Sequence, residues 1–123
     1  MTSAGNLDIQ IDQGANFLLP FQLIGSDGNP VSMALAIITG KIRSTPQATT
    51  VIATFTGTVT DGPEGIGQVT LTNTETAAIP VDPSTSDDRV LTTYQYDITV
   101  EFSDGFKQRV LEGYCYVSPE VDR

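Results

Sequence analysis

The sequence predicts an all-β domain, a two-sheet antiparallel β-sandwich with immunoglobulin-like connections, seven or eight strands and at most one short helix. Ten valines, ten isoleucines and seventeen threonines make 37 of the 123 residues β-branched. Apolar and polar residues alternate over long stretches, and clusters of Gly, Asp, Asn and Pro interrupt them about every ten residues. A small barrel is the alternative architecture. We expect residues 1–123 to form one domain, with extended termini at 1–6 and 118–123.

The stretch 93–118 predicts one long β-hairpin around which the other strands are arranged. Asp104 and Gly105 supply the turn, because Gly adopts a positive φ without steric cost. The first strand should bury alternate residues, namely Tyr94, Tyr96, Ile98, Val100 and Phe102. In the second strand, the same period places Leu111, Gly113, Cys115 and Val117 on one face and Val110, Glu112, Tyr114 and Tyr116 on the other.

Two short strands are predicted before the first long turn. Leu7, Ile9 and Ile11 alternate with polar residues in one of them. The other has apolar side chains at 17, 19, 21 and 23, and Pro20 lies inside it. Because proline cannot donate a ladder hydrogen bond, this strand should lie at a sheet edge or contain a bulge.

Three further strands follow the turn at 26–30. The first buries Ile38 and Ile42 on either side of Gly40, and Lys41 and Arg43 on its outer face make that face locally positive. The second buries residues 51, 53, 55, 57 and 59 and exposes a row of threonines, Thr54, Thr56, Thr58 and Thr60. The third turns residues 67, 69 and 71 inward.

The segment 73–79 predicts the single short helix. Asn73 or Thr74 could cap its start, and Ala77, Ala78 and Ile79 would pack back onto the sheets. The loop at 80–88 is then either a contact surface or simply mobile.

Composition and charge exclude several classes of function. Six Lys and Arg against fifteen Asp and Glu give a net charge of −9, which would repel nucleic acid and anionic membrane surfaces. We see neither a signal peptide nor an apolar stretch of about 20 residues, and therefore expect synthesis in the cytoplasm. The single cysteine, Cys115, should be a buried hydrophobe, not a nucleophile.

The residues available for catalysis or cofactor binding are few. Histidine is absent, which removes the usual general base and nearly all common zinc sites. Asp97 and Glu101 lie four residues apart on one strand, about 13 Å from each other, which is too far for an acid and base pair. The carboxylates at 82, 87 and 88 do not have calcium-loop spacing, and the glycines at 62, 65 and 67 form a turn. We therefore expect no enzyme and no metal or other cofactor.

Two groups of residues are candidates for a protein interface. One is the set of tyrosines on the hairpin, which either pack across the strands or form an aromatic contact patch. The other is the charged tail that leaves the last strand at Pro119, which either frays or docks on a neighbour. The candidate interface residues are Tyr94, Tyr96, Tyr114, Tyr116, Ser118, Pro119, Glu120, Val121, Asp122 and Arg123.

Four sequence stretches together resemble a known group of proteins. They are I-D-Q-G-A-N-F at 11–17, the G-S-D-G-N-P turn at 25–30, the Ile42-Arg43 pair, and Y-D-I-T-V-E-F-S-D-G-F-K-Q-R-V-L-E-G-Y-C-Y-V-S-P-E-V-D-R at 96–123. The chain resembles small virion proteins of tailed bacteriophages, in particular the immunoglobulin-like domains that begin baseplate upper proteins and occur in short tail, fibre-attachment and neck proteins. The family tends to end V-S-P-E-V-T-R, and Asp122 replaces that threonine here.

The resemblance implies a non-enzymatic structural protein located in the virion, without a cofactor, whose partners are other virion proteins. We expect a homo-oligomer or a repeated ring subunit, since edge strands and flat faces favour self-association. A capsid decoration or cement protein is one alternative. A carbohydrate-binding module for host adhesion is another, although the absence of tryptophan argues against it.

Overall fold

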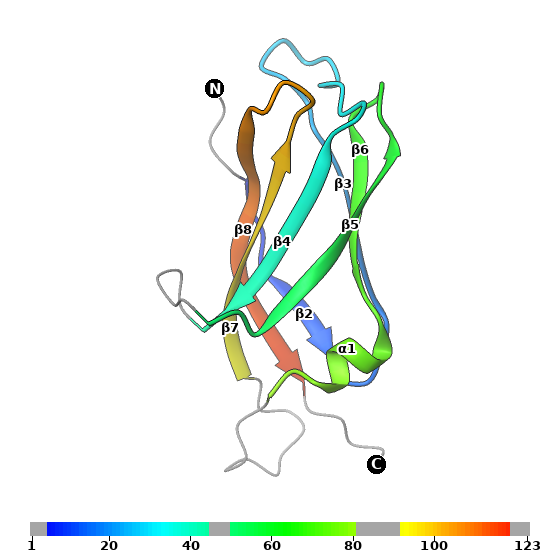
Figure 1. Cartoon of the computed structure of the whole chain (residues 1–123). Coiled ribbons are helices and arrows are strands. Elements are labelled where there is room, and N and C mark those ends of the chain that lie inside the picture. Colours follow the sequence, from blue (N-terminus) through cyan, green and yellow to red (C-terminus); the bar gives the residue numbers. More distant parts are fainter. Residues whose placement is uncertain (1–4, 45–49, 81–91, 119–123) are drawn as a thin grey trace.

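The computed structural model describes residues 5–44, 50–80 and 92–118, and these are mostly β-strand (Figure 1). Eight strands and one five-residue helix are present in this part of the chain. They are β1 Gly5–Asn6, β2 Ile9–Asp12, β3 Phe17–Gln22, β4 Ile37–Arg43, β5 Ala53–Asp61, β6 Ile66–Leu71, α1 Asn73–Ala77, β7 Thr92–Glu101 and β8 Lys107–Ser118.

The strands form one curled sheet in the order β1-β8-β7-β4-β5-β6-β3, and β2 also pairs with β8. The prediction that all strands are antiparallel is wrong at one edge, because β1 and β2 both run parallel to β8. Among the described residues no pairing joins β3 to β1 or β2, so the sheet curls without closing. The strands are therefore continuous through a single sheet, and the expected division into two separate sheets is not evident from the pairing.

Strand β5 lies where the sheet curls. Its first residues pair with β4, up to Thr56 opposite Thr39, and its later residues pair with β6. Gly57 follows this switch, and a Cβ there would lie only 2.2 Å from the backbone oxygen of Ile38. Because only glycine allows this close approach, residue 57 fixes how tightly β5 passes β4.

The predicted hairpin is confirmed, with β7 and β8 paired antiparallel over their whole length. Gly105 has a φ of +90° in the turn, as the Asp-Gly signal requires. One detail of the facing pattern is wrong, because the register shifts between Ile98 and Thr99 and leaves Val110 as an extra residue in β8. This bulge turns Val110 inward, where it is buried, while Leu111 is only partly buried.

The alternation predicted for the middle strands is also confirmed. Ile38, Gly40 and Ile42 of β4 are buried, and the threonines of β5 at 54, 56, 58 and 60 are exposed. Strand β3 pairs only with β6, so Pro20 occupies an edge strand as its missing N–H predicts.

The short helix is present, but its cap is not the predicted one. Thr72 is the N-cap, and its hydroxyl accepts a hydrogen bond from the Glu75 N–H while the Glu75 carboxylate accepts one from the Thr72 N–H. The cap was expected at Asn73 or Thr74, and the reciprocal pairing with Glu75 places it one residue or more earlier. Ile79 packs into the core as predicted, whereas Ala77 and Ala78 are exposed and Thr76 is buried instead.

The interior of the curled sheet holds one apolar cluster. Ring contacts cross it from Phe17 of β3 through Phe55 of β5 to Tyr96 of β7, with centroids 5.9 and 6.3 Å apart. Cys115 lies in this cluster and is fully buried, as predicted.

Near the two chain ends, the described residues belong to paired strands. Gly5 and Asn6 form β1, and Ser118 is the last residue of β8, paired with Asp12.

In the part of the chain that the structure describes, no helix has the length and apolar character needed to cross a membrane.

Candidate functional site

The outer face of β4, β7 and β8 carries every lysine and arginine that the structure describes. Lys41 and Arg43 come from β4, and Lys107 and Arg109 come from β8. All four point outward because the buried residues of these strands occupy the alternate positions. We call Lys41, Arg43, Lys107 and Arg109 the cationic face.

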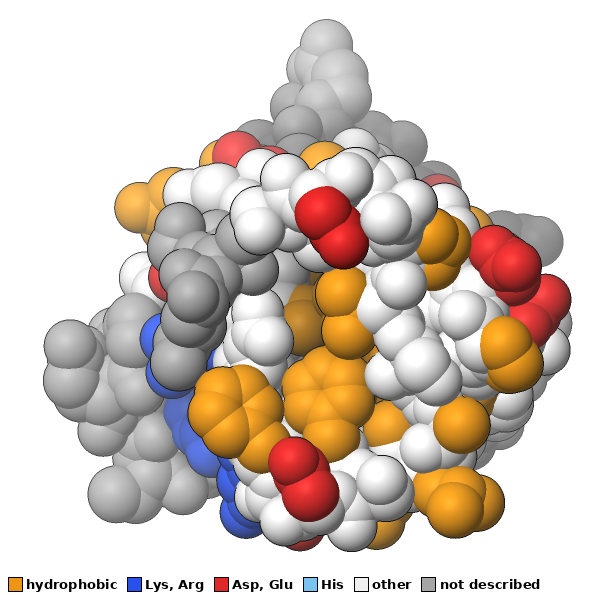
Figure 2. Space-filling model, turned by 90° about the horizontal axis from the view of Figure 1, so that it is seen from above, with side chains coloured by type: hydrophobic (Ala, Val, Ile, Leu, Met, Phe, Trp, Pro, Cys, Tyr) orange, Lys and Arg blue, Asp and Glu red, His pale blue; other side chains and the backbone are white. Residues whose placement is uncertain are grey.

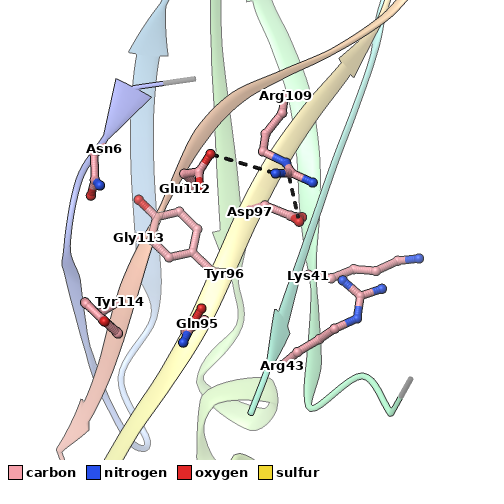
Figure 3. A pocket seen from close by; sticks show the side chains of 10 residues that line it. All are labelled: Asn6, Lys41, Arg43, Gln95, Tyr96, Asp97, Arg109, Glu112, Gly113 and Tyr114. Carbon is pink, nitrogen blue, oxygen red and sulfur yellow. Dashed lines mark ion pairs between the residues drawn. The ribbon is translucent and has the colours of Figure 1, made fainter. Parts of the chain in front are cut away.

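Strand pairing places carboxylates among these cations. Asp97 of β7 lies opposite both Lys41 of β4 and Glu112 of β8, and Glu101 lies opposite Lys107. Figure 3 shows Arg109 between Asp97 and Glu112, with Lys41 and Arg43 extending from the neighbouring strand. The face therefore mixes both signs of charge within three adjacent strands.

The ion pairs on this face are loose. Arg109 Nε lies 3.8 Å from Asp97 Oδ2, and a terminal nitrogen of Arg109 lies 3.8 Å from Glu112 Oε1, with the arginine side chain 57% exposed. Exposed pairs of this kind contribute about 0–1 kcal/mol to stability. The side chains of Lys41 and Arg43 make no ion pair or hydrogen bond with any residue that the structure describes.

A shallow hollow of about 230 Å³ lies on this face. Its charged part is formed by the cations at 41, 43 and 109 with Asp97 and Glu112, and the rest is polar or aromatic. The polar and aromatic lining consists of Asn6, Gln95, Tyr96, Gly113 and Tyr114 (Figure 3).

The distribution of charge separates this face from the rest of the molecule. The described residues include four cations and ten carboxylates, and three of those carboxylates, Asp97, Glu101 and Glu112, lie on the cationic face. The remaining seven are at positions 8, 12, 27, 61, 64, 75 and 104, and of these Asp8 borders the hollow, since its Oδ1 accepts a hydrogen bond from the Tyr114 N–H at 3.0 Å. The potential therefore favours an acidic partner at this face and disfavours one over the rest of the described surface.

The four tyrosines do not form one contact patch. Tyr94 and Tyr96 are buried, and their hydroxyls donate to the backbone oxygens of Pro80 and Leu7. Tyr114 and Tyr116 lie on the outer face of β8 with ring centroids 6.2 Å apart, and Tyr114 is 48% exposed. Only the second pair is placed to contact a partner.

The other predicted interface residues are in the tail. Ser118 ends β8, and residues 119–123 lie outside the described residues. The acidic loop positions 82, 87 and 88 are also outside them.

The residues that could act in catalysis or bind a metal ion do not form a cluster in the part of the chain that the structure describes. Residues 5–44, 50–80 and 92–118 contain no group of three His, Cys, Asp or Glu side chains that could hold a metal ion. Asp97 and Glu101 share a strand face, but Asp97 is near Arg109 and Glu101 is opposite Lys107. Burial raises the pKa of the Cys115 thiol to about 12, so it stays protonated at neutral pH.

The sequence indicated half of this site. Lys41 and Arg43 were predicted to make the outer face of one strand positive, whereas Arg109, Glu112 and Gln95 were not connected to them. Strands β4 and β7 are neighbours in the sheet although β5 and β6 separate them in the sequence. The strict alternation predicted for β8 would have turned Arg109 to the same side as Leu111 and Cys115, and it is the bulge at Val110 that turns Arg109 outward.

Comparison of the chain with models of known protein families and with curated proteins finds no match.

Proposed function

We propose that this chain is a non-enzymatic structural protein that acts through protein–protein contacts, and that the cationic face is its main contact surface. The observation that carries the proposal is the gathering of Lys41, Arg43, Lys107 and Arg109 on one face of a chain with a net charge of −9. The side chains of Lys41 and Arg43 make no ion pair or hydrogen bond with the described residues, so that an acidic segment of another protein would give them their partners.

The resemblance to tailed-phage virion proteins gives this surface its context. We propose that the chain is a component of a tail, baseplate, fibre attachment or neck, and that other virion proteins are its partners. Nucleic acid and membrane are not proposed as partners, because the net charge of −9 would repel a long anionic polymer or an anionic lipid surface. A capsid decoration protein would use the same face in the same way.

The immunoglobulin-like interpretation of the fold is part of the same proposal. Its support is the behaviour of β5, which pairs with β4 at one end and with β6 at the other. Strands β8, β7 and β4 then correspond to one layer and β6 and β3 to the second, with Phe17, Phe55 and Tyr96 packed between them. The parallel pairing of β2 with β8 extends the first layer.

A carbohydrate-binding module is a second candidate because Tyr114 is exposed beside Asn6 and Gln95 in the hollow. An exposed aromatic ring with amide groups beside it could stack on and hydrogen-bond a sugar. Screening the protein against a glycan panel distinguishes the two candidates. Binding that is lost in Tyr114→Ala and kept in Lys41→Gln/Arg43→Gln would favour the module.

The structural proposal is tested by assembly of particles in cells that supply a variant chain. Lys41→Gln/Arg43→Gln removes two positive charges from the cationic face, and the copy number of the chain per particle, measured by quantitative mass spectrometry, should fall at least about tenfold. Leu18→Glu/Thr58→Glu is the matched control, since it changes the net charge equally at exposed positions on β3 and β5. Absence of the unaltered chain from purified particles would overturn the proposal.

A further inference from the structure

The four members of the cationic face do not have the same surroundings. Arg109 has its two loose ion pairs with carboxylates of β7 and β8, and Lys107 lies opposite a carboxylate of β7. The side chains of Lys41 and Arg43 make no ion pair or hydrogen bond with the described residues. Figure 2, which looks at the molecule from above, shows Lys and Arg side chains on one flank. The positive charge that no described side chain pairs with therefore lies on β4.

Lys41 and Arg43 are separated by one residue of a strand, which sets the distance between them. Residues at i and i+2 of a strand point to the same face, and Ile42 between them is buried. A rise of about 3.4 Å per residue places the two backbone positions about 7 Å apart. A ligand that pairs with both cations therefore needs two negative groups at about this spacing.

The sequence contains one segment with carboxylates at that spacing. Of the fifteen acidic residues, only Glu120 and Asp122 are separated by a single residue. They belong to the segment 119–123, which follows β8 and lies outside the described residues. In an extended chain their side chains would project to one side about 7 Å apart, and that of Arg123 would project to the other. The positive charge of Arg123 would then not face β4.

The segment 119–123 is too short to bring both carboxylates onto the cations of its own copy. Lys41 lies level, across β7, with Glu112 of β8, which is six residues before Ser118 at the end of that strand. That separation is about 20 Å along β8 and about 10 Å across two strand spacings. Asp122 follows Ser118 by four residues, about 13 Å of extended chain, and part of that length is needed to reverse direction. The carboxylates of one copy are therefore placed to meet another copy.

We propose that the segment 119–123 of one copy docks on β4 of the next, with Glu120 and Asp122 over Lys41 and Arg43. The inference rests on the proposed function and names the acidic segment as part of a second copy of this chain. Opposite charges at matched spacing supply both attraction and register. Because the segment and the face lie at different places on one chain, the contact repeats from copy to copy around a ring or along a filament.

Charge reversal on the two sides of the contact tests it. Glu120→Lys/Asp122→Lys, the segment variant, makes the segment positive, and Lys41→Glu/Arg43→Glu, the face variant, makes β4 negative. Combining the four substitutions restores both the net charge of −9 and the attraction, with the signs exchanged. Thermal unfolding shows whether each variant is folded. Lys41→Gln/Arg43→Gln is the milder face variant for use if glutamates beside Asp97 destabilise the strand.

Sedimentation velocity over a range of concentrations measures the association. The unaltered chain should associate, and each reversed variant alone should associate at least about tenfold more weakly, because like charges then meet. An equimolar mixture of the two variants should recover the association, since the positive segment of one meets the negative β4 of the other. The chain with all four substitutions should recover it as well. Added salt should weaken every one of these associations.

The matched control places the charge change elsewhere on the sheet. Leu18→Glu/Thr58→Glu changes the net charge by the same amount as Lys41→Gln/Arg43→Gln, at exposed positions on β3 and β5. It should change the association by less than about twofold, whereas the variant on β4 should weaken it at least about tenfold. Equal losses in the two variants would contradict a contact at β4.

Three further results would overturn the inference. They are an unaltered chain that stays monomeric at all concentrations, a segment variant that associates as strongly as the unaltered chain, and a mixture that does not recover the association. None of them decides the proposed function, which depends on whether particles contain the chain and whether Lys41→Gln/Arg43→Gln lowers its copy number. A loss of that variant from particles together with a monomeric unaltered chain would leave the proposed function standing with a different acidic partner.

Discussion

The two halves of the sheet bury similar interiors and present different exteriors. Strands β4, β7 and β8 cover the core with residues such as Ile42, Ile98 and Val117, and β5, β6 and β3 cover it with residues such as Phe55 and Val69. Outside, the first half carries the cationic face and three carboxylates, whereas β5 carries a row of uncharged threonines. If the cationic face is the contact surface that we propose, stability and contact chemistry occupy opposite faces of the same strands, and substitutions can separate them.

The largest effect is expected at Gly57, where β5 joins the two halves of the sheet by passing close to β4. Gly57→Ala should lower the free energy of unfolding by about 3 kcal/mol, because the new Cβ meets the Ile38 backbone and must push β5 away from β4. Chemical denaturation monitored by circular dichroism measures the loss.

Gly28→Ala is the matched control for that substitution. Gly28 has a positive φ of +82°, which Gly57 does not, and nothing lies within 4 Å of the added Cβ, so only the backbone conformation costs free energy, about 1 kcal/mol. Equal losses in the two variants would mean that the halves are not tightly joined at residue 57.

A second test measures how the free energy of unfolding depends on pH. Among the described residues, cysteine and tyrosine occur only in β7 and β8, so their titration reports on that half of the sheet. Burial raises the pKa of Cys115 from 9.0 to about 12 and that of Tyr96 from 10.0 to about 12. Above pH 9 the unfolded chain releases the thiol proton while the folded chain keeps it, so raising the pH favours unfolding. The free energy of unfolding should be insensitive to these groups below pH 9, fall by up to about 1.4 kcal/mol per pH unit between pH 9 and 10 because of Cys115, and fall more steeply above pH 10, where Tyr96 adds a second proton.

Cys115→Ala identifies the group responsible for that slope. Between pH 9 and 10 the dependence should largely disappear in this variant, measured by denaturation at several pH values. In the native protein the thiol should also react slowly with a thiol reagent at pH 8. An unchanged slope, or rapid labelling without unfolding, would show that Cys115 is not part of the core.

The smallest expected effect on stability belongs to the cationic face. Arg109→Gln removes two loose, exposed ion pairs and should change the free energy of unfolding by less than about 0.5 kcal/mol. The same variant should bind its protein partner more weakly, and Arg109→Lys should recover most of the binding. A loss of stability above about 1 kcal/mol would mean that this face supports the fold.

The sequence alone determined the local structure of this chain. Alternation identified the inward residues of β4, β5, β6 and β7, Asp104 and Gly105 located the hairpin turn, and Pro20 placed β3 at an edge. Each of these predictions depends on a property of a few neighbouring residues. Alternation reflects the two-residue period of a strand, the turn reflects the positive φ that Gly105 tolerates, and the edge position reflects the missing N–H of Pro20. Cys115 was predicted in the core for the same reason.

The tertiary structure decided what depends on distant residues. Val110 faces inward because the pairing of β8 with β7 contains a bulge at that residue. The cap at Thr72 is a different case, since Thr72 and Glu75 form a capping box only three residues apart, a local signal that the prediction missed. The parallel placement of β2 beside β8, the single continuous sheet and the passage of β5 between its halves follow from pairings across the whole chain. The cationic face exists only because β7 lies between β4 and β8, bringing Lys41 and Arg109, 68 positions apart in number, to the two sides of Asp97. No local pattern records which strands become neighbours, since that choice is made by the packing of the shared core.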